Sequence, residues 1–71
     1  MSTYEIPFIT ECVYAFGQRF SLSRQGAYEY LRKFEGLPFL IEFYDVEHLQ
    51  SIEDTLDDLV VICRNNGGYL S

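Results

Sequence analysis

Apolar residues recur at spacings of three and four along most of the chain, and this period constrains the fold more than any other feature of the sequence. In the first segment, the recurring residues are Ile6, Ile9, Val13, Phe16 and Phe20. Residues at this spacing lie on one face of an α-helix, because a helix turns by about 100° per residue. No segment shows the strong alternation of apolar and polar residues that a half-buried strand requires. The period therefore predicts an all-α fold.

A second helix is predicted after a short polar link. Its apolar stripe consists of Ala27, Tyr30, Leu31 and Phe34. Ser21 or Ser23 can cap its start, because a serine hydroxyl accepts a hydrogen bond from the free amides of the first turn. Gly36 can take the left-handed conformation that commonly ends a helix.

The third predicted helix has the only histidine of the chain at the end of its apolar stripe. That stripe consists of Leu37, Ile41, Tyr44 and His48. The simplest interpretation is that His48 is a packed or hydrogen-bonded joint between two helices. A contact for a partner is an alternative, and catalysis or metal binding is a third. No nucleophile motif lies beside His48, although Asp45 could orient its ring, and one histidine alone makes no metal site.

The fourth predicted helix begins at Ser51, where the run SIED has the form of a capping box that ends in Asp54. Its stripe consists of Ile52, Leu56, Leu59, Val60 and Cys63. Gly67 is expected to end it. Asp57 and Asp58 lie near its start, where negative charge is favourable. A calcium loop alternates its acids and includes a glycine turn, so helix electrostatics explains this pair better than metal binding.

Four such helices with short links predict one domain over residues 1–71, folded as a compact bundle of about four short helices. The segment that follows the last helix, residues 68–71, is expected to be a mobile tail.

Charge is distributed unevenly along the chain. The net charge is −6, and no Lys or Arg occurs between Lys33 and Arg64. An acidic half repels a phosphate backbone, so nucleic acid is not expected as a partner. A basic protein surface would be attracted, although simple solvation of the acids is the more economical explanation.

The two cysteines, Cys12 and Cys63, lie in apolar helical runs without zinc-ligand spacing. They are expected to behave as small buried hydrophobes. The first residues, MSTYEIPF, lack the pattern of a secretory signal, and no apolar run approaches the length of a membrane span. These features favour the cytoplasm, and they give no reason to expect a metal or other cofactor.

A family resemblance rests on the stretch AYEYLRKFEGLPFLIEFYDVEHLQSIEDTLDDLVVICRNNGG. It combines a Tyr-Leu helix closed by Gly, a Phe-Leu segment, a YD-x-x-H step, a Ser-led DD helix and a terminal Asn-Gly-Gly. In these features it resembles a bacterial family known as domain of unknown function thirty-seven ninety-one. The run FITECVYAFGQRFSLS also suits the first helix of that family, so the resemblance covers nearly the whole chain.

The resemblance implies a short bacterial protein, of a kind often encoded beside a second small protein that resembles an ADP-ribosyltransferase toxin. It therefore implies an antitoxin or accessory subunit. No catalytic residue is established for the family, so none is carried over. The positions that match its motif, and that we expect to contact a partner, are Tyr44, Asp45, His48, Asp57 and Asp58.

Together these features predict a protein-interaction module without catalytic activity, and a homo-oligomer is compatible with them. A nucleic-acid-binding accessory protein and a small ligand-binding bundle centred on His48 are the alternatives.

Overall fold

The computed structural model of the protein describes residues 4–70, and in this range it contains five helices and no strand. The helices are α1 (Glu5–Phe20), α2 (Arg24–Lys33), α3 (Gly36–Glu42), α4 (Tyr44–Glu47) and α5 (Ile52–Asn65). The predicted all-α fold is confirmed, with one helix more than expected because the third predicted helix breaks at Phe43. None of the helices in this range combines the length and the hydrophobicity that crossing a bilayer requires.

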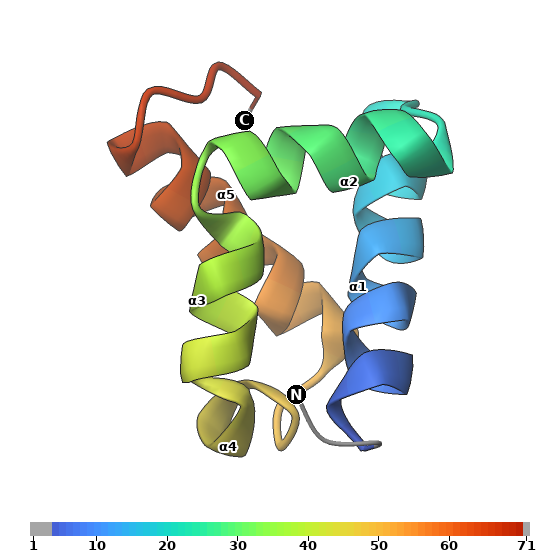
Figure 1. Ribbon diagram of the computed structural model, residues 1–71, viewed down its shortest axis with the longest axis vertical. Coiled ribbons are helices and arrows are strands. Elements are labelled where there is room, and N and C mark those ends of the chain that lie inside the picture. Colours follow the sequence, from blue (N-terminus) through green and yellow to red (C-terminus); the bar gives the residue numbers. More distant parts are fainter. Residues whose placement is uncertain (1–3, 71) are drawn as a thin grey trace.

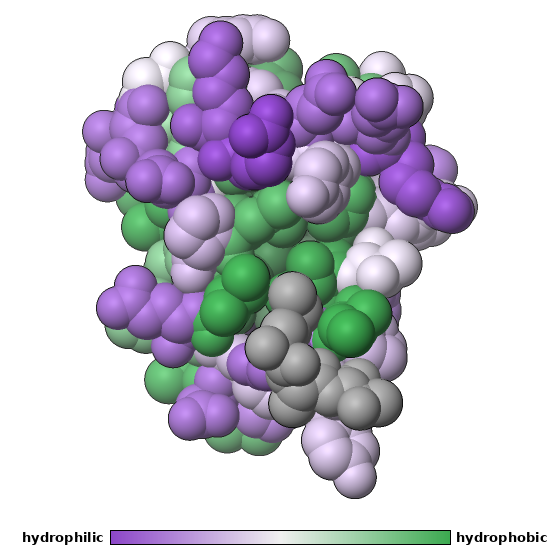
Figure 2. All heavy atoms as spheres, viewed as in Figure 1, coloured by the Kyte–Doolittle hydropathy of each residue, from purple (hydrophilic) through white to green (hydrophobic). Residues whose placement is uncertain are grey.

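The helices form a small globule of about 29 × 22 × 20 Å. In Figure 1, α1 and α3 run along opposite sides, α2 crosses above them, and α5 passes behind, in contact with both α1 and α3. The short helix α4 lies at the lower end of α3. Figure 2 shows hydrophobic side chains reaching the surface between α1 and α3, whereas hydrophilic side chains gather over α2.

Serine side chains begin two of the helices. The Ser51 hydroxyl accepts a hydrogen bond from the Asp54 amide at 3.1 Å, as the predicted start of α5 requires. At α2, the Ser23 hydroxyl accepts from the Gly26 amide at 3.0 Å. Ser21, the other predicted cap of α2, instead ends α1 in the left-handed conformation, with φ of 58°.

The prediction that Gly36 takes the left-handed conformation was wrong. Glu35 takes it, with φ of 72°, and Gly36 is the first residue of α3. A β-carbon at Gly36 would lie 2.7 Å from Cδ2 of Leu31 and 3.2 Å from Sγ of Cys63. Glycine is therefore required here for the close approach of α2, α3 and α5.

The core is built from the inward faces of four helices. Its largest fully buried apolar side chains are Phe16, Leu31, Leu40, Leu56 and Leu59. Both cysteines are buried and free, as expected of small hydrophobes. The stripe predicted for the third helix is only partly correct, because Leu37 is buried while Ile41 and His48 are exposed. In α3 the buried face runs through Leu37 and Leu40, which leaves Ile41 outside, and beyond the break at Phe43 the helical stripe does not continue to His48.

The segment after α5 turns back over α2. Gly67 ends the helix as predicted, with φ of 98°. The amide of Leu70 donates to the Tyr30 hydroxyl at 3.0 Å, and the ring of Tyr69 meets the Tyr30 ring edge-on at 5.4 Å. Mobility of residues 68–71 stays a prediction, and Ser71 lies outside the described residues.

Candidate interaction surface

The break between α3 and α4 brings three apolar side chains to one side of a short corner, residues 43–50. The Val46 amide donates to the Phe43 carbonyl at 3.0 Å, and the Leu49 amide donates to the Val46 carbonyl at 3.2 Å. The Glu47 and His48 amides also make bonds of the α-helical kind, to the Phe43 and Tyr44 carbonyls, and in this mixed turn side chains three apart are neighbours on one side. We call Phe43, Val46 and Leu49 the corner ridge. Their exposed fractions are 44%, 62% and 78%, so the ridge faces solvent.

Acidic side chains lie beside the corner ridge. Glu42 is the last residue of α3 and Asp45 lies in the first turn of α4, and both are exposed. In the part of the chain that the structure describes, neither forms an ion pair. The nearest bases in the sequence are Lys33 and Arg64. The surface is therefore an apolar ridge with uncompensated negative charge beside it.

Tyr44 and His48 contact each other within the corner. Their rings are parallel to within 5° with centroids 4.3 Å apart, and His48 Nδ1 is hydrogen bonded to the Tyr44 carbonyl. The Phe8 ring of α1 meets the Tyr44 ring edge-on at 5.4 Å. The prediction of a joint between two helices is therefore wrong for the imidazole, because His48 bonds to a carbonyl of its own helix α4 and its ring lies exposed on Tyr44.

The inward side of the corner holds a buried polar group, which we call the carboxyl cluster: Glu47, Gln50, Thr55 and Asp58. The Gln50 amide donates to Glu47 Oε1 at 2.9 Å and to Asp58 Oδ2 at 2.8 Å. The Thr55 hydroxyl, fully buried, donates to the Glu47 carbonyl at 3.2 Å. One amide and one hydroxyl therefore tie α4 to α5.

Glu47 is only 5% exposed, which is unusual for a carboxylate. Burial, followed by the neighbouring Asp58 carboxyl, raises its pKa to about 7, and the Gln50 amide acts against them. The Glu47 carboxyl therefore keeps its proton to a higher pH than an exposed glutamate does.

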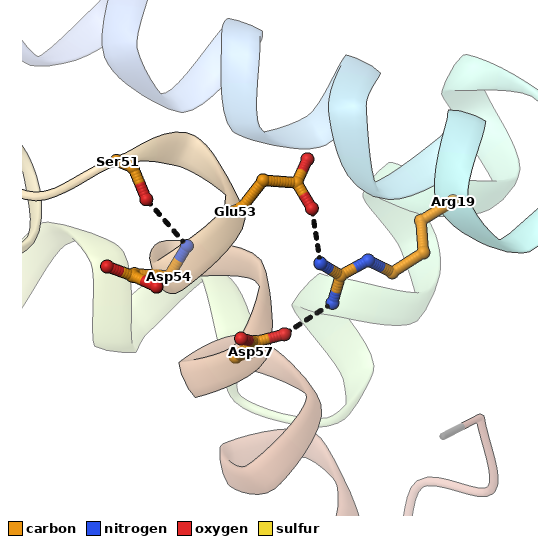
Figure 3. Close-up of polar contacts among 5 residues, drawn as sticks. All are labelled: Arg19, Ser51, Glu53, Asp54 and Asp57. Atoms are coloured by element: carbon orange, nitrogen blue, oxygen red, sulfur yellow. Dashed lines mark hydrogen bonds and ion pairs between the residues drawn. The ribbon is translucent and has the colours of Figure 1, made fainter.

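Arg19 of α1 reaches the first turns of α5, close to the helix start that Ser51 caps (Figure 3). Its guanidinium donates to Glu53 at 2.8 Å and to Asp57 at 2.9 Å. These hydrogen bonds, first that to Glu53, raise the pKa of Arg19 above its ordinary value. One cation thus compensates two acids of α5 within the molecule.

The five predicted partner-binding residues are divided by this arrangement. Tyr44, Asp45 and His48 share the corner, and Asp58 reaches it through Gln50. Asp57 does not, because it is bound by Arg19. The sequence reasoning did not identify the ridge or most of the carboxyl cluster, namely Phe43, Val46, Leu49, Glu47, Gln50 and Thr55.

One signal in the sequence could have indicated part of the carboxyl cluster. Thr55 is a polar residue that lies three after Ile52 and four before Leu59, on the apolar stripe of its own helix. A polar side chain at such a position is buried, and a buried hydroxyl needs a partner. The corner ridge had no comparable signal, because it depends on where the helix breaks.

The two cysteine thiols of the core are poor nucleophiles. Burial raises the pKa of Cys12 to about 12, with Glu11 and Glu47 contributing, and burial raises the pKa of Cys63 to about 11. Both thiols are therefore protonated at neutral pH. Among residues 4–70, no three His, Cys, Asp or Glu side chains gather at a position that could hold a metal ion.

Comparison with known protein families identifies the family of the chain. The model of a family described as a protein of unknown function, DUF3791, matches residues 7–66. No curated protein and no solved structure matches the chain.

Proposed function

Since the chain belongs to the DUF3791 family, whose description assigns no activity, we propose from its own surface that it is a protein-interaction module that docks through the corner ridge. The observation that carries this proposal is the exposure of Phe43, Val46 and Leu49 on one side of the corner, beside the acids Glu42 and Asp45. Exposed apolar side chains that lie together are characteristic of docking sites.

The chemistry of the surface defines the partner. An apolar pocket would cover the ridge, and basic side chains around that pocket would meet Glu42 and Asp45. The net charge of −6 would speed the encounter with such a surface, because long-range attraction raises association rates. His48 and Asp45 stay predicted contacts of the partner, with Tyr44 as the support of His48.

The identity of the partner is a second step of the proposal. The family resemblance implies a neighbouring gene for a protein similar to an ADP-ribosyltransferase toxin. We propose that this chain acts in the cytoplasm as the antitoxin or accessory subunit of that protein, and that it inhibits by covering the surface of the toxin without any chemistry of its own.

A binding assay with two matched variants tests the docking site. The neighbouring gene product is co-expressed and purified with the wild-type chain, with Val46→Glu and with Val61→Glu. Val46 belongs to the ridge, whereas Val61 is a similarly exposed valine, at 51%, on α5. We expect Val46→Glu to weaken binding at least about tenfold, because a buried charge lacks compensation, and Val61→Glu to leave it unchanged.

Two outcomes would contradict the proposal. Absence of binding by the wild-type chain at micromolar concentration would exclude this partner. Equal binding by both variants would show that the ridge is not the contact surface. Circular dichroism of each variant checks that the fold is retained.

A further inference from the structure

The corner ridge and the carboxyl cluster are two sides of the same eight residues. Phe43, Val46 and Leu49 follow one another on the outer side, while Glu47 and Gln50 lie on the inner side at the same spacing of three. Whatever fixes Glu47 and Gln50 against α5 therefore also fixes the position of the ridge.

The attachment consists mainly of polar contacts. The Gln50 amide nitrogen donates to a carboxyl oxygen of Glu47 at 2.9 Å and to one of Asp58 at 2.8 Å, so the two carboxyl groups lie side by side. Two carboxyl groups can share a hydrogen bond only if one of them holds a proton. When both are ionised, they become neighbouring like charges, one of them buried and the other partly exposed.

Among residues 4–70, neither carboxyl of this pair forms an ion pair with a cation. The groups that face Glu47 are the Asp58 carboxyl from α5 and the Cys12 thiol from α1. The charged residue at the adjoining end of α3 is Glu42, which has the same sign. Arg19, the base that reaches α5, is bound by Glu53 and Asp57 on its exposed edge.

We propose that Glu47 and Asp58 form a proton-operated latch, which holds the corner against α5 while one proton is shared and releases it when that proton passes to the solvent. In the closed state, the ridge has one fixed geometry. In the open state, the repulsion between the two carboxylates moves residues 43–50 away from α5, and the ridge becomes mobile. As a control of docking, the latch rests on the proposed function, but the latch itself requires no partner.

Amide hydrogen exchange of the isolated protein tests the latch directly. The readout is the protection factor, in which the intrinsic pH dependence of exchange is already removed, of the Glu47 and His48 amides. These amides donate to the Phe43 and Tyr44 carbonyls. Between pH 6 and pH 8.5, we expect their protection to fall about tenfold or more, because opening releases one proton. Protection in α1 should fall only as far as the global free energy of unfolding does, because its core amides exchange by global unfolding.

Matched variants identify the groups responsible. Asp58→Asn should reduce the fall, because Glu47 then ionises beside a neutral amide, and Asp57→Asn should keep it, because Asp57 is bound by Arg19 at the neighbouring position. His48→Asn should also keep it, which separates the latch from the imidazole of the corner. If Asp58→Asn does not fold, Glu47→Gln provides the same test.

The latch is overturned if protection of these amides in the wild type is constant from pH 6 to pH 8.5. It is also overturned if protection in Asp58→Asn and in Glu47→Gln falls as much as it does in the wild type. This outcome is independent of the partner assay. If the exchange experiment contradicts the latch, the binding assay with Val46→Glu can still support the docking site. If the binding assay finds no partner, the exchange experiment can still support the latch.

Discussion

Gly36 lies where α2, α3 and α5 meet, and the neighbouring residue Glu35 has the conformation that glycine usually takes. The side chain of Leu31 and the sulfur of Cys63 occupy the space that a β-carbon at Gly36 would need. Glu35, and not Gly36, takes the left-handed conformation, with φ of 72°, although this conformation is unfavourable for a residue with a side chain. The sequence Glu-Gly therefore places glycine for packing and leaves the strain on glutamate.

Substitutions at these two positions should change stability in opposite directions. Gly36→Ala should lower the free energy of unfolding by about 1–3 kcal/mol, because the added carbon overpacks the core. Glu35→Gly should raise it by about 0.5–1 kcal/mol, because the left-handed strain is removed. Urea denaturation monitored by circular dichroism measures both changes. Equal effects of the same sign would contradict this account of the turn.

Within residues 4–70, the contact of α1 with α5 is the helix contact that has ion pairs at its edge. Arg19 is more than half covered, whereas Glu53 and Asp57 are mostly exposed, so each contact is a surface interaction of modest strength. Its role is to fix the start of α5 beside α1, at the turn that Ser51 caps (Figure 3).

Removal of the Arg19 ion pairs should cause a small, salt-sensitive loss of stability. Arg19→Gln should lower the free energy of unfolding by about 1 kcal/mol at low salt, and the loss should shrink in 1 M NaCl because salt screens exposed charges. Arg24→Gln is the matched control, since Arg24 forms no ion pair among residues 4–70 and should change stability by less than about 0.5 kcal/mol. A loss at Arg19 that is unaffected by salt would instead indicate lost packing.

At the scale of the whole molecule, one buried carboxyl couples the fold to pH. The pKa of Glu47 is about 7 in the folded state and 4.5 as the ordinary value. The folded state therefore binds this proton more tightly than the unfolded state does. Its stabilising contribution is complete below pH 4.5 and is lost as the pH rises through 7.

This difference predicts a decline in stability with rising pH. Between pH 4.5 and pH 8.5, the wild-type chain should lose about 3 kcal/mol of unfolding free energy through Glu47, on the basis of about 1.4 kcal/mol per pKa unit. In Glu47→Gln the decline should be much smaller. Urea denaturation of both proteins over this pH range measures the difference. A constant difference between them would show that Glu47 does not titrate in the folded state.

The sequence by itself determined the all-α class, the Ser51 cap, the end of α5 at Gly67 and most of the buried positions. These features depend on local chemistry, namely the helical period, the hydroxyl acceptor at a helix start and the conformational freedom of glycine. The acidic character of residues 35–58 was also visible, because charge is a property of composition.

Only the tertiary structure decided where the third predicted helix breaks and what that break produces. The apolar period runs through Phe43 without interruption, so nothing local indicates that Val46 and Leu49 face solvent while Glu47 is buried. Asp57 and Asp58 are adjacent and chemically identical, yet one meets Arg19 of α1 and the other meets Gln50 of the corner. Their roles differ because neighbouring helical residues point about 100° apart, and only the packing of the helices determines what each side chain reaches.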